Sequence, residues 1–511
     1  IKLSEHLNYE SIAEQLDNIK RMTPHAIDGL LPCQRKVIAV CRNTKGDLKV
    51  SGLSGKITDK MNYGYGEASI QGSIKYMAQI FPGSNRFPLL LTISDANGSQ
   101  FYGRTKNPAA RYCRVTTNKL VVLYYPVEDD DLLEVVYEEG KPYEPINYVP
   151  ILPRILLEDT KAIATGWNSR FTARKFETII KLVKFSIENY PLIRCPDLLG
   201  FADLYPGMSI KIINGKEYCL GSYQVQGNKI IITQLPLGLW GEKIVESITA
   251  SLIEKKSTKK STKNTKRKKR EKDYKKIVSS VDNETGKNLR ICINLLPGAL
   301  KEIEEFTFFE NKTKIRAIPE ISAIEEYFGL YKIFSRNLNF FYRDGLKSYS
   351  TIENIFKDWF VERRKLYIKR LKKKYIKIKA EILFYKNMLR FITEYGSQID
   401  YKDEELANKM LDESGFVRFN KSKIFKSQRC SAKELKKLIY ESGTFKYIYN
   451  IKQSAYTTKN IGALKEKILN LENDLLEQEK KTWTSTWIEE LEEFEKKYQF
   501  GKSVDWNYNL I

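Results

Sequence analysis

Two long series of heptad-spaced apolar residues constrain the fold of this chain more than any other feature. From Ile352 onward, apolar side chains recur at alternating steps of three and four residues: Ile368, Leu371, Tyr375, Ile378, Ile382, Tyr385, Leu389 and Ile392. A second seam comprises Ile461, Leu464, Ile468, Leu471 and Leu475, and it resumes at Trp487, Leu491, Phe494 and Tyr498. This spacing is typical of helices that pack along each other. It predicts an antiparallel coiled coil with arms at 346–395 and 461–500 around a small globular segment, 396–460; an ordinary helical bundle is the alternative.

The chain before the seams divides into a helical and a strand-rich part. Residues 1 to about 42 read as helical, with a helix over Gln34–Arg42 after an earlier one, which predicts a helix-turn-helix module that extends to about residue 125. In residues 126–345, alternating runs such as Met208–Ile213 and Lys229–Leu235 are bounded by Asn-Gly and Gly-Asn turns, which indicates strands. The predicted class is therefore an α+β multidomain protein, for which 511 residues leave ample room.

Charge points to a polyanionic partner. The net charge is +23, and residues 255–276 alone hold thirteen Lys or Arg. Such a surplus favours nucleic acid, although an AT-rich genome also enriches lysine. The basic segment is predicted to be a flexible insert, either in contact with phosphates or passive.

Cysteine and histidine usage excludes several kinds of site. The seven cysteines contain no CxxC pair, which argues against a zinc site or a disulfide framework and for a reducing compartment. Only two histidines are present, so most histidine-based schemes are excluded. No signal peptide or membrane-spanning run is found, and we expect a soluble intracellular protein.

One stretch carries the elements of a nucleophilic site. Residues 98–115 read GSQFYGRTKNPAARYCRV, with Arg111 directly before Tyr112. A phenol is a weak nucleophile at neutral pH and needs positive charge where a transition state gains negative charge. A guanidinium suits the oxygens of a phosphodiester. Among 31 tyrosines, however, such a pair is more often a packed aromatic beside a surface charge.

Three further motifs accompany this pair in a fixed order: RMTPHAIDGLLPCQRKVI at Arg21–Ile38, NYGYGEASI at Asn62–Ile70 and AIATGW at Ala162–Trp167. Together the four stretches resemble the DNA breakage-reunion core of type IIA DNA topoisomerases. The form of the Arg-Tyr motif looks most like the separate DNA-cleavage subunit of T-even phages. The next most similar in style are the eukaryotic and large-DNA-virus enzymes.

The resemblance implies roles for individual residues. Tyr112 would form a phosphotyrosyl link to a DNA 5′ end, and Arg111, Arg35 and Tyr65 would assist. Ile163 would wedge between base pairs and bend the duplex. Further DNA contacts are expected at Arg21, Lys36, Arg42, Lys60, Arg104 and Lys106. Two departures stand out, since Leu31 replaces a family lysine, and Gly64 and Tyr65 replace two histidines.

The resemblance also implies an architecture. Residues 1–125 would form a winged-helix-like domain with the catalytic tyrosine, and 126–345 a tower-like domain that contains the basic insert. Residues 346–395 and 461–500 would be the arms, and 396–460 a C-gate tip at which two protomers meet.

Cofactors and partners are expected from outside this sequence. No Gly-rich ATPase loop and no Toprim acidic cluster are found, because Asp129-Asp130-Asp131 lacks that context. Mg²⁺ and ATP would be held by a partner Toprim/ATPase subunit or by a missing part of a longer chain. The predicted function is the cleavage part of an ATP-dependent topoisomerase, an isomerase. It would act as a homodimer on double-stranded DNA in a bacterial host cytoplasm, a nucleus or a viral factory. A non-enzymatic, basic coiled-coil DNA-architecture protein is the alternative.

Overall fold

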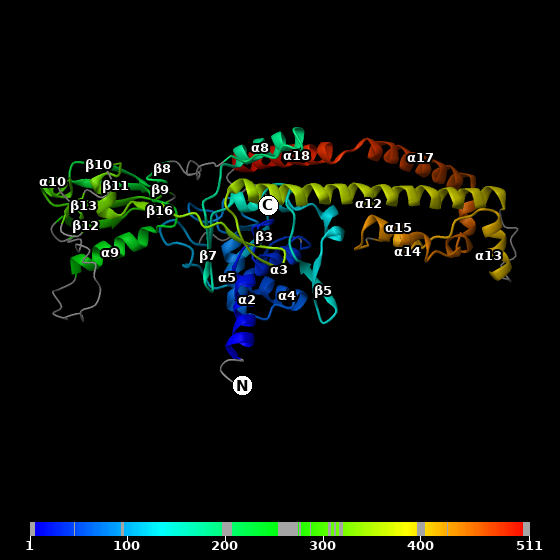
Figure 1. The fold of residues 1–511 in the computed structure, drawn as a ribbon, viewed down its shortest axis with the longest axis horizontal. Helices are drawn as coiled ribbons and strands as arrows, with labels where there is room; N and C mark the ends of the chain where they lie inside the picture. The colour runs from blue at the N-terminus through cyan, green and yellow to red at the C-terminus, as the bar shows by residue number, and fades with distance from the viewer. Residues whose placement is uncertain are drawn as a thin grey trace.

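The computed structural model is an elongated molecule with a central body, a β-rich unit on one side and a long helical arm on the other (Figure 1). It describes residues 6–44, 46–93, 97–196, 207–253, 274, 277–286, 288–304, 308–310, 313–315, 320–395, 404–426 and 428–503. The predicted basic insert, 255–276, lies outside these residues except for Tyr274.

The central body begins with helices and a small sheet. The helices are α2 (Ser11–Met22), α3 (Pro32–Cys41), α4 (Val50–Met61) and α5 (Glu67–Met77). The antiparallel sheet has the order β1-β3-β2, formed by β1 (Leu48–Lys49), β3 (Arg114–Thr117) and β2 (Leu90–Thr92). Pro32 occupies the first turn of α3, where its missing N–H is not needed. Asn62, in a left-handed conformation, ends α4 and turns the chain toward α5.

Short elements complete the body: α6 (Val121–Tyr124), the 3₁₀ helix η2 (Val127–Leu132), α7 (Arg154–Leu157), α8 (Phe176–Glu188), and the hairpins β4–β5 (Val135–Glu138, Lys141–Pro145), β6–β7 (Thr160–Ala164, Trp167–Phe171) and β17–β18 (Asn339–Tyr342, Gly345–Ser348). The body, the root of the arm and the last helix share one apolar core.

The β-rich unit has a core of its own. Its four-stranded antiparallel sheet has the order β10-β11-β13-β12, formed by β10 (Ser222–Gln226), β11 (Lys229–Gln234), β13 (Ile291–Leu295) and β12 (Val278–Asn283). A second sheet has the order β16-β9-β8, formed by β16 (Tyr331–Phe334), β9 (Lys216–Leu220) and β8 (Ser209–Ile213). The unit also contains α9 (Gly241–Ile253), α10 (Ala299–Glu304), α11 (Ala323–Phe328) and the hairpin β14–β15 (Phe308–Glu310, Thr313–Ile315). The strands predicted near residues 208–213 and 229–235 are confirmed as β8 and β11.

The arm is built on α12 (Ile352–Glu394), a helix of 43 residues. Helix α17 (Thr458–Lys480) runs back along it, as the two seams predict (Figure 1). The second seam is not one continuous arm, because α17 ends at Lys480 and α18 (Trp483–Ser503) follows. Trp487 still packs against Trp359 and Phe360 of α12, whereas Phe494 and Tyr498 pack against Phe87 and Phe176 of the body.

The segment between the arms folds back along α12 instead of lying only at its far end (Figure 1). It contains α13 (Glu404–Glu413), α14 (Lys421–Phe425), α15 (Ala432–Tyr440) and α16 (Lys446–Tyr449). Its core includes Phe384 and Phe391 of α12 together with Phe416 and Phe419. Within the part of the chain that the structure describes, no helix is long and apolar enough to span a bilayer.

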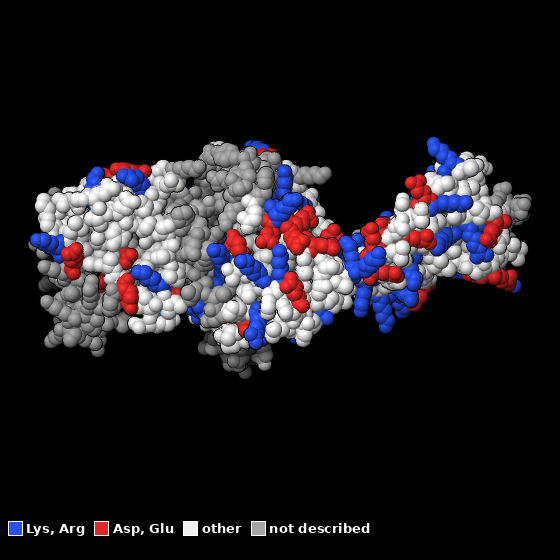
Figure 2. All heavy atoms as spheres, turned by 90° about the horizontal axis from the view of Figure 1, so that it is seen from above, with Lys and Arg blue, Asp and Glu red and all other residues white. Residues whose placement is uncertain are grey.

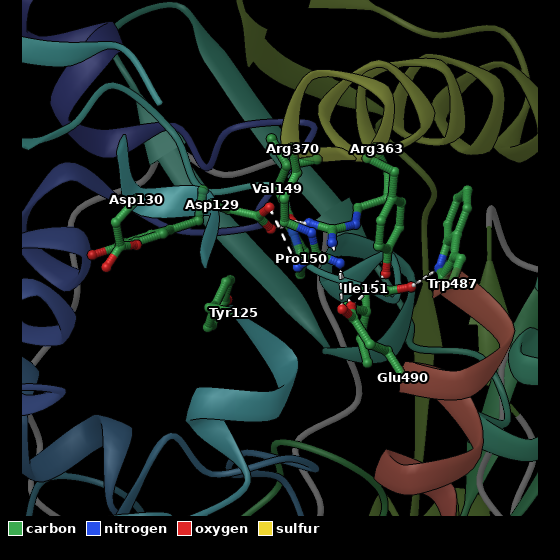
Figure 3. A network of polar contacts seen from close by, with 12 residues as sticks. Tyr125, Asp129, Asp130, Val149, Pro150, Ile151, Arg363, Arg370, Trp487 and Glu490 are labelled. Carbon is green, nitrogen blue, oxygen red and sulfur yellow. Dashed lines mark hydrogen bonds and ion pairs between the residues drawn. The ribbon is translucent and has the colours of Figure 1, made fainter. Parts of the chain in front are cut away.

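A buried polar network fixes the root of the arm to the body (Figure 3). Arg363 of α12 pairs with Asp129 of η2, and both side chains are almost fully buried. The Arg363 guanidinium also donates to the Val149 carbonyl at 2.8 Å. Arg370 pairs with Glu490 of α18. Burial alone would lower the pKa of Arg363, but Asp129, Tyr367 and Glu490 together outweigh burial and raise the pKa above its usual value.

Candidate active site

Tyr112 lies at the surface of the body, at the end of a loop. Its side chain is 66% exposed, and the Arg111 guanidinium carbon lies 4.8 Å from the centre of its ring. The Tyr112 N–H donates to the Ala109 carbonyl at 2.9 Å, which closes a turn directly before β3. Cys113, the next residue, is buried in the core. A fixed backbone therefore carries an exposed phenol and an adjacent guanidinium.

The loop before Tyr112 is clamped to the β-rich unit through glycines. Gly98 and Gly103 have φ of +78° and +75°, a region that L side chains rarely adopt. A Cβ on Gly103 would lie 3.0 Å from the Trp240 ring, so this glycine also permits close packing. Phe101 enters the core of the β-rich unit, and its carbonyl accepts from the Glu242 N–H at 2.9 Å. The sequence pointed to the basic residues of this loop, but it did not predict the contacts of Gly103 and Phe101 with the β-rich unit.

Arg104 and Lys106, the predicted DNA contacts of this loop, have protein partners. Arg104 Nε donates to the Gly83 carbonyl at 2.9 Å, and its guanidinium carbon lies 4.4 Å from the Tyr76 ring centre. Lys106 forms an ion pair with Glu242 at the surface, and the hydrogen bond to that carboxylate raises the pKa of Lys106. Lys106 is exposed and could exchange this partner for a phosphate.

In the loop between α4 and α5, Tyr65 lies against a cation of α2, Arg21. The Arg21 guanidinium carbon lies 4.4 Å from the centre of the Tyr65 ring, in a cation–π contact. The Tyr65 hydroxyl donates to Asp17 at 3.4 Å. Partial burial, and then the Asp17 charge, raise the pKa of Tyr65, so its hydroxyl stays protonated at neutral pH. Tyr65 thus provides a donor and a platform, and Arg21 provides the positive charge.

Three of the predicted cations are held inside the body. Arg35 Nε donates to Asp28 at 2.7 Å, and only 6% of Arg35 is exposed. Lys36 Nζ donates to Glu144 at 2.9 Å and to the Met61 carbonyl at 2.7 Å. Arg42 pairs with Asp130 at 2.8 Å and donates to the Tyr125 carbonyl at 2.8 Å. These partners indicate structural roles, whereas Lys60 is exposed on α4.

His25 is neutral at pH 7. Burial lowers its pKa to about 4, and its Nδ1 accepts from the Ile27 N–H at 3.2 Å.

Ile163 lies at the end of the β6–β7 hairpin, where it is 67% exposed. Trp167 follows across the turn and is also exposed. The Thr165 N–H and hydroxyl both donate to Asn18 of α2 at 3.1 Å, which ties the hairpin to the helix that carries Arg21.

Lys161 and Arg170 are cross-strand partners on the same hairpin. Like charges placed directly opposite are unfavourable in a sheet unless an anion neutralises them.

The described residues do not fit a magnesium site. Among them, no group of three or more His, Cys, Asp or Glu side chains is arranged to hold a metal ion. Asp129 pairs with Arg363, Asp130 with Arg42, and Asp131 with Lys373 at 3.7 Å. Within the described residues, the seven cysteines form no disulfide.

Comparisons with known proteins agree with the motifs in indicating a type II DNA topoisomerase family. The family model that describes the A subunit of DNA gyrase/topoisomerase IV matches residues 21–492. A DNA topoisomerase 2 of African swine fever virus is 28% identical over 540 residues, covering 100% of this chain and 43% of the viral protein. DNA topoisomerase 2 top-2 of Caenorhabditis elegans is 27% identical over 398 residues, covering 77% of this chain and 24% of the nematode protein. This chain thus spans less than half the length of these relatives.

The fold is also found in a solved structure. The DNA-binding, cleavage and re-ligation domain of Plasmodium falciparum topoisomerase II matches with a TM-score of 0.77 and 23% identity, covering 98% of this chain and 65% of that one. The relatives are viral and eukaryotic, so the finer likeness to a T-even phage protein, suggested by the Arg-Tyr motif, is not supported.

Proposed function

Because this chain belongs to the family of DNA gyrase/topoisomerase IV A subunits, we propose that it is the DNA-cleavage and reunion core of a type II topoisomerase. The observation that best supports this proposal is that Tyr112 is exposed and has the Arg111 guanidinium against its ring. The loop that holds both residues packs closely at Gly103 against Trp240. Capture of 5′-linked protein on a duplex after denaturation in detergent tests the proposal.

The chemistry follows from these side chains. The Tyr112 oxygen attacks a backbone phosphorus, a bond forms to the 5′ phosphate, and the bond to the 3′ oxygen breaks. The phenol loses its proton and the departing 3′ oxygen gains one, so the step conserves charge and reverses on religation. Arg111, and Arg21 on its Tyr65 platform, would stabilise the negative charge that develops at phosphorus. Mg²⁺ carboxylates and the ATPase would come from another module, as the resemblance to type IIA topoisomerases implies.

The domain roles extend this proposal. Helices α3 to α5 with the sheet β1-β3-β2 support a winged-helix assignment for residues 1–125. The β-rich unit would be the tower-like domain, and it reaches the cleavage loop through Trp240. Within this arrangement, Ile163 and Tyr112 would face one duplex.

Replacing Ile163 with Ala should reduce both DNA bending and cleavage while leaving the affinity for DNA largely intact. An apolar wedge unstacks a base step, whereas the cations hold the backbone independently. Energy transfer between dyes at the two ends of a short duplex measures the bend. Ile212→Ala, at an exposed isoleucine of β8, is the matched control. An unchanged bend in Ile163→Ala would remove this residue from the DNA-binding surface.

We further infer a homodimer that meets through the segment between the arms. Leu411 and Phe416 of this segment are buried in its own core. Leu406 and Met410 remain exposed on α13. A second copy covering this helix would bury both, and closed two-fold contacts are the commonest arrangement of soluble oligomers.

The double variant Leu406→Lys, Met410→Lys should shift the chain from dimer toward monomer in light scattering. Charged side chains at the centre of an apolar contact would have to be desolvated. Leu469→Lys, at an exposed leucine of α17, controls for the loss of an apolar side chain. If the double variant stays as dimeric as this control, the contact lies elsewhere.

A further inference from the structure

A basic cavity lies where the arm leaves the body, apart from the tyrosine site. Its volume is about 340 Å³, and it is enclosed by η2, the α12 segment near Lys374, the α14 region and the junction of α17 and α18. Figure 2 shows Lys and Arg side chains gathered at this narrow waist, with Asp and Glu side chains beside them. Residues from three parts of the molecule therefore line the cavity: the body, the arm and the segment between the arms.

The cations of the cavity outnumber its carboxylates. Seven Lys or Arg and four Asp or Glu line it. Three carboxylates are engaged: Glu490 by Arg370, Asp131 by Lys373 at 3.7 Å and Glu489 by Lys481 at 3.4 Å. Four ammonium groups then face a single remaining carboxylate, that of Glu128.

Among the residues that the structure describes, these four ammonium groups have no ion pair with a carboxylate of the cavity. Lys423 donates only to the neutral Gln428 side chain, at 3.0 Å. Within the described residues, the side-chain ammonium groups of Lys374, Lys377 and Lys426 make no hydrogen bond or ion pair, and the charge of Lys377 is partly balanced by Glu381, one turn further along α12. Unpaired like charges that converge on one cavity raise its local potential, which an anion relieves.

We propose that this cavity binds a phosphate chain, either that of a free polyphosphate or nucleotide or that of a DNA backbone. Phosphate oxygens carry dense negative charge and accept strong hydrogen bonds from several ammonium groups at once. The volume is within the range of small-molecule sites and suits two or three linked phosphates. A bound chain would bridge the body, α12 and the α14 region, and would hold the arm at a fixed angle. The proposal does not depend on chemistry at Tyr112.

The test titrates the full chain with tripolyphosphate and, separately, with a short DNA duplex, by calorimetry. The cavity variant is Lys374→Gln with Lys426→Gln. The control is Lys433→Gln with Lys436→Gln, which removes the same charge from exposed positions of α15 outside the cavity. Thermal unfolding checks that both variants fold.

If the cavity binds free phosphate chains, tripolyphosphate should bind the unmodified chain and the control variant. The cavity variant should then bind tripolyphosphate roughly tenfold more weakly, or weaker still. A backbone site predicts no tripolyphosphate binding, but a loss of duplex affinity and a smaller salt slope in the cavity variant alone. Equal binding of both probes by the two variants would overturn the proposal. Tyr112→Phe should bind both probes normally, which separates this proposal from the cleavage chemistry.

Discussion

Tyr112→Phe is expected to abolish covalent attachment of the protein to DNA while leaving DNA binding in place. The substitution removes one oxygen from an exposed ring, and the Arg111 contact with that ring can persist. Without the oxygen no phosphotyrosyl bond can form, and removal of a nucleophile costs on the order of 10⁴-fold or more in rate. The assay combines the chain with a Toprim-bearing module, Mg²⁺ and an end-labelled duplex, and then denatures it in detergent.

Tyr102→Phe is the matched control for this experiment. Tyr102 lies in the same loop, is also exposed and has Lys106 at 5.2 Å from its ring centre. We expect this variant to retain adducts on 5′ ends. Adducts that persist in Tyr112→Phe, or that form on 3′ ends, contradict the assigned chemistry.

Asp129→Asn is expected to destabilise the junction of arm and body by about 3–5 kcal/mol, the usual cost of leaving a buried charge without its partner. The amide fits the same space but leaves Arg363 without its buried counter-charge (Figure 3). Glu490, 3.6 Å from Arg363 and shared with Arg370, cannot replace it. Trp359 and Trp487, whose indoles donate to Pro150 and Ile151, report on this junction by fluorescence during denaturant unfolding.

Glu128→Gln controls for the loss of a negative charge from the same 3₁₀ turn. Glu128 is exposed, so we expect its replacement to change the free energy of unfolding by about 0.5 kcal/mol or less. If Asp129→Asn unfolds at the same denaturant concentration as Glu128→Gln, the network does not hold the arm.

Heptad spacing predicted the helices of the arm but not everything that covers them. α12 and α17 follow the predicted seams. The continuation has the same spacing, and Trp487 still packs against Trp359 of α12, but Phe494 and Tyr498 pack against Phe87 and Phe176 of the body. Spacing identifies the apolar face of a helix, and the partner of that face is decided by contacts distant in sequence.

The same distinction applies to the site. Tyr112 and Ile163, singled out through motifs, are exposed at the ends of a loop and a hairpin. Arg35 and Lys36 belong to an equally specific motif but are buried, and the partner of Lys36, Glu144, lies 108 positions away. No pattern in the sequence around Lys36 predicts that Glu144 is its partner. Gly98 and Gly103 were the available signal for the clamped loop, because glycines at such spacing often mark strained turns.

The most direct test of the central claim is to locate the DNA-protein bond by mass spectrometry. Trapped adducts are trimmed with nuclease, digested with protease and fragmented. We predict a peptide that carries a nucleotide through its 5′ phosphate on Tyr112. A nucleotide on another exposed tyrosine, such as Tyr102 or Tyr65, or one attached through its 3′ phosphate, would contradict the account.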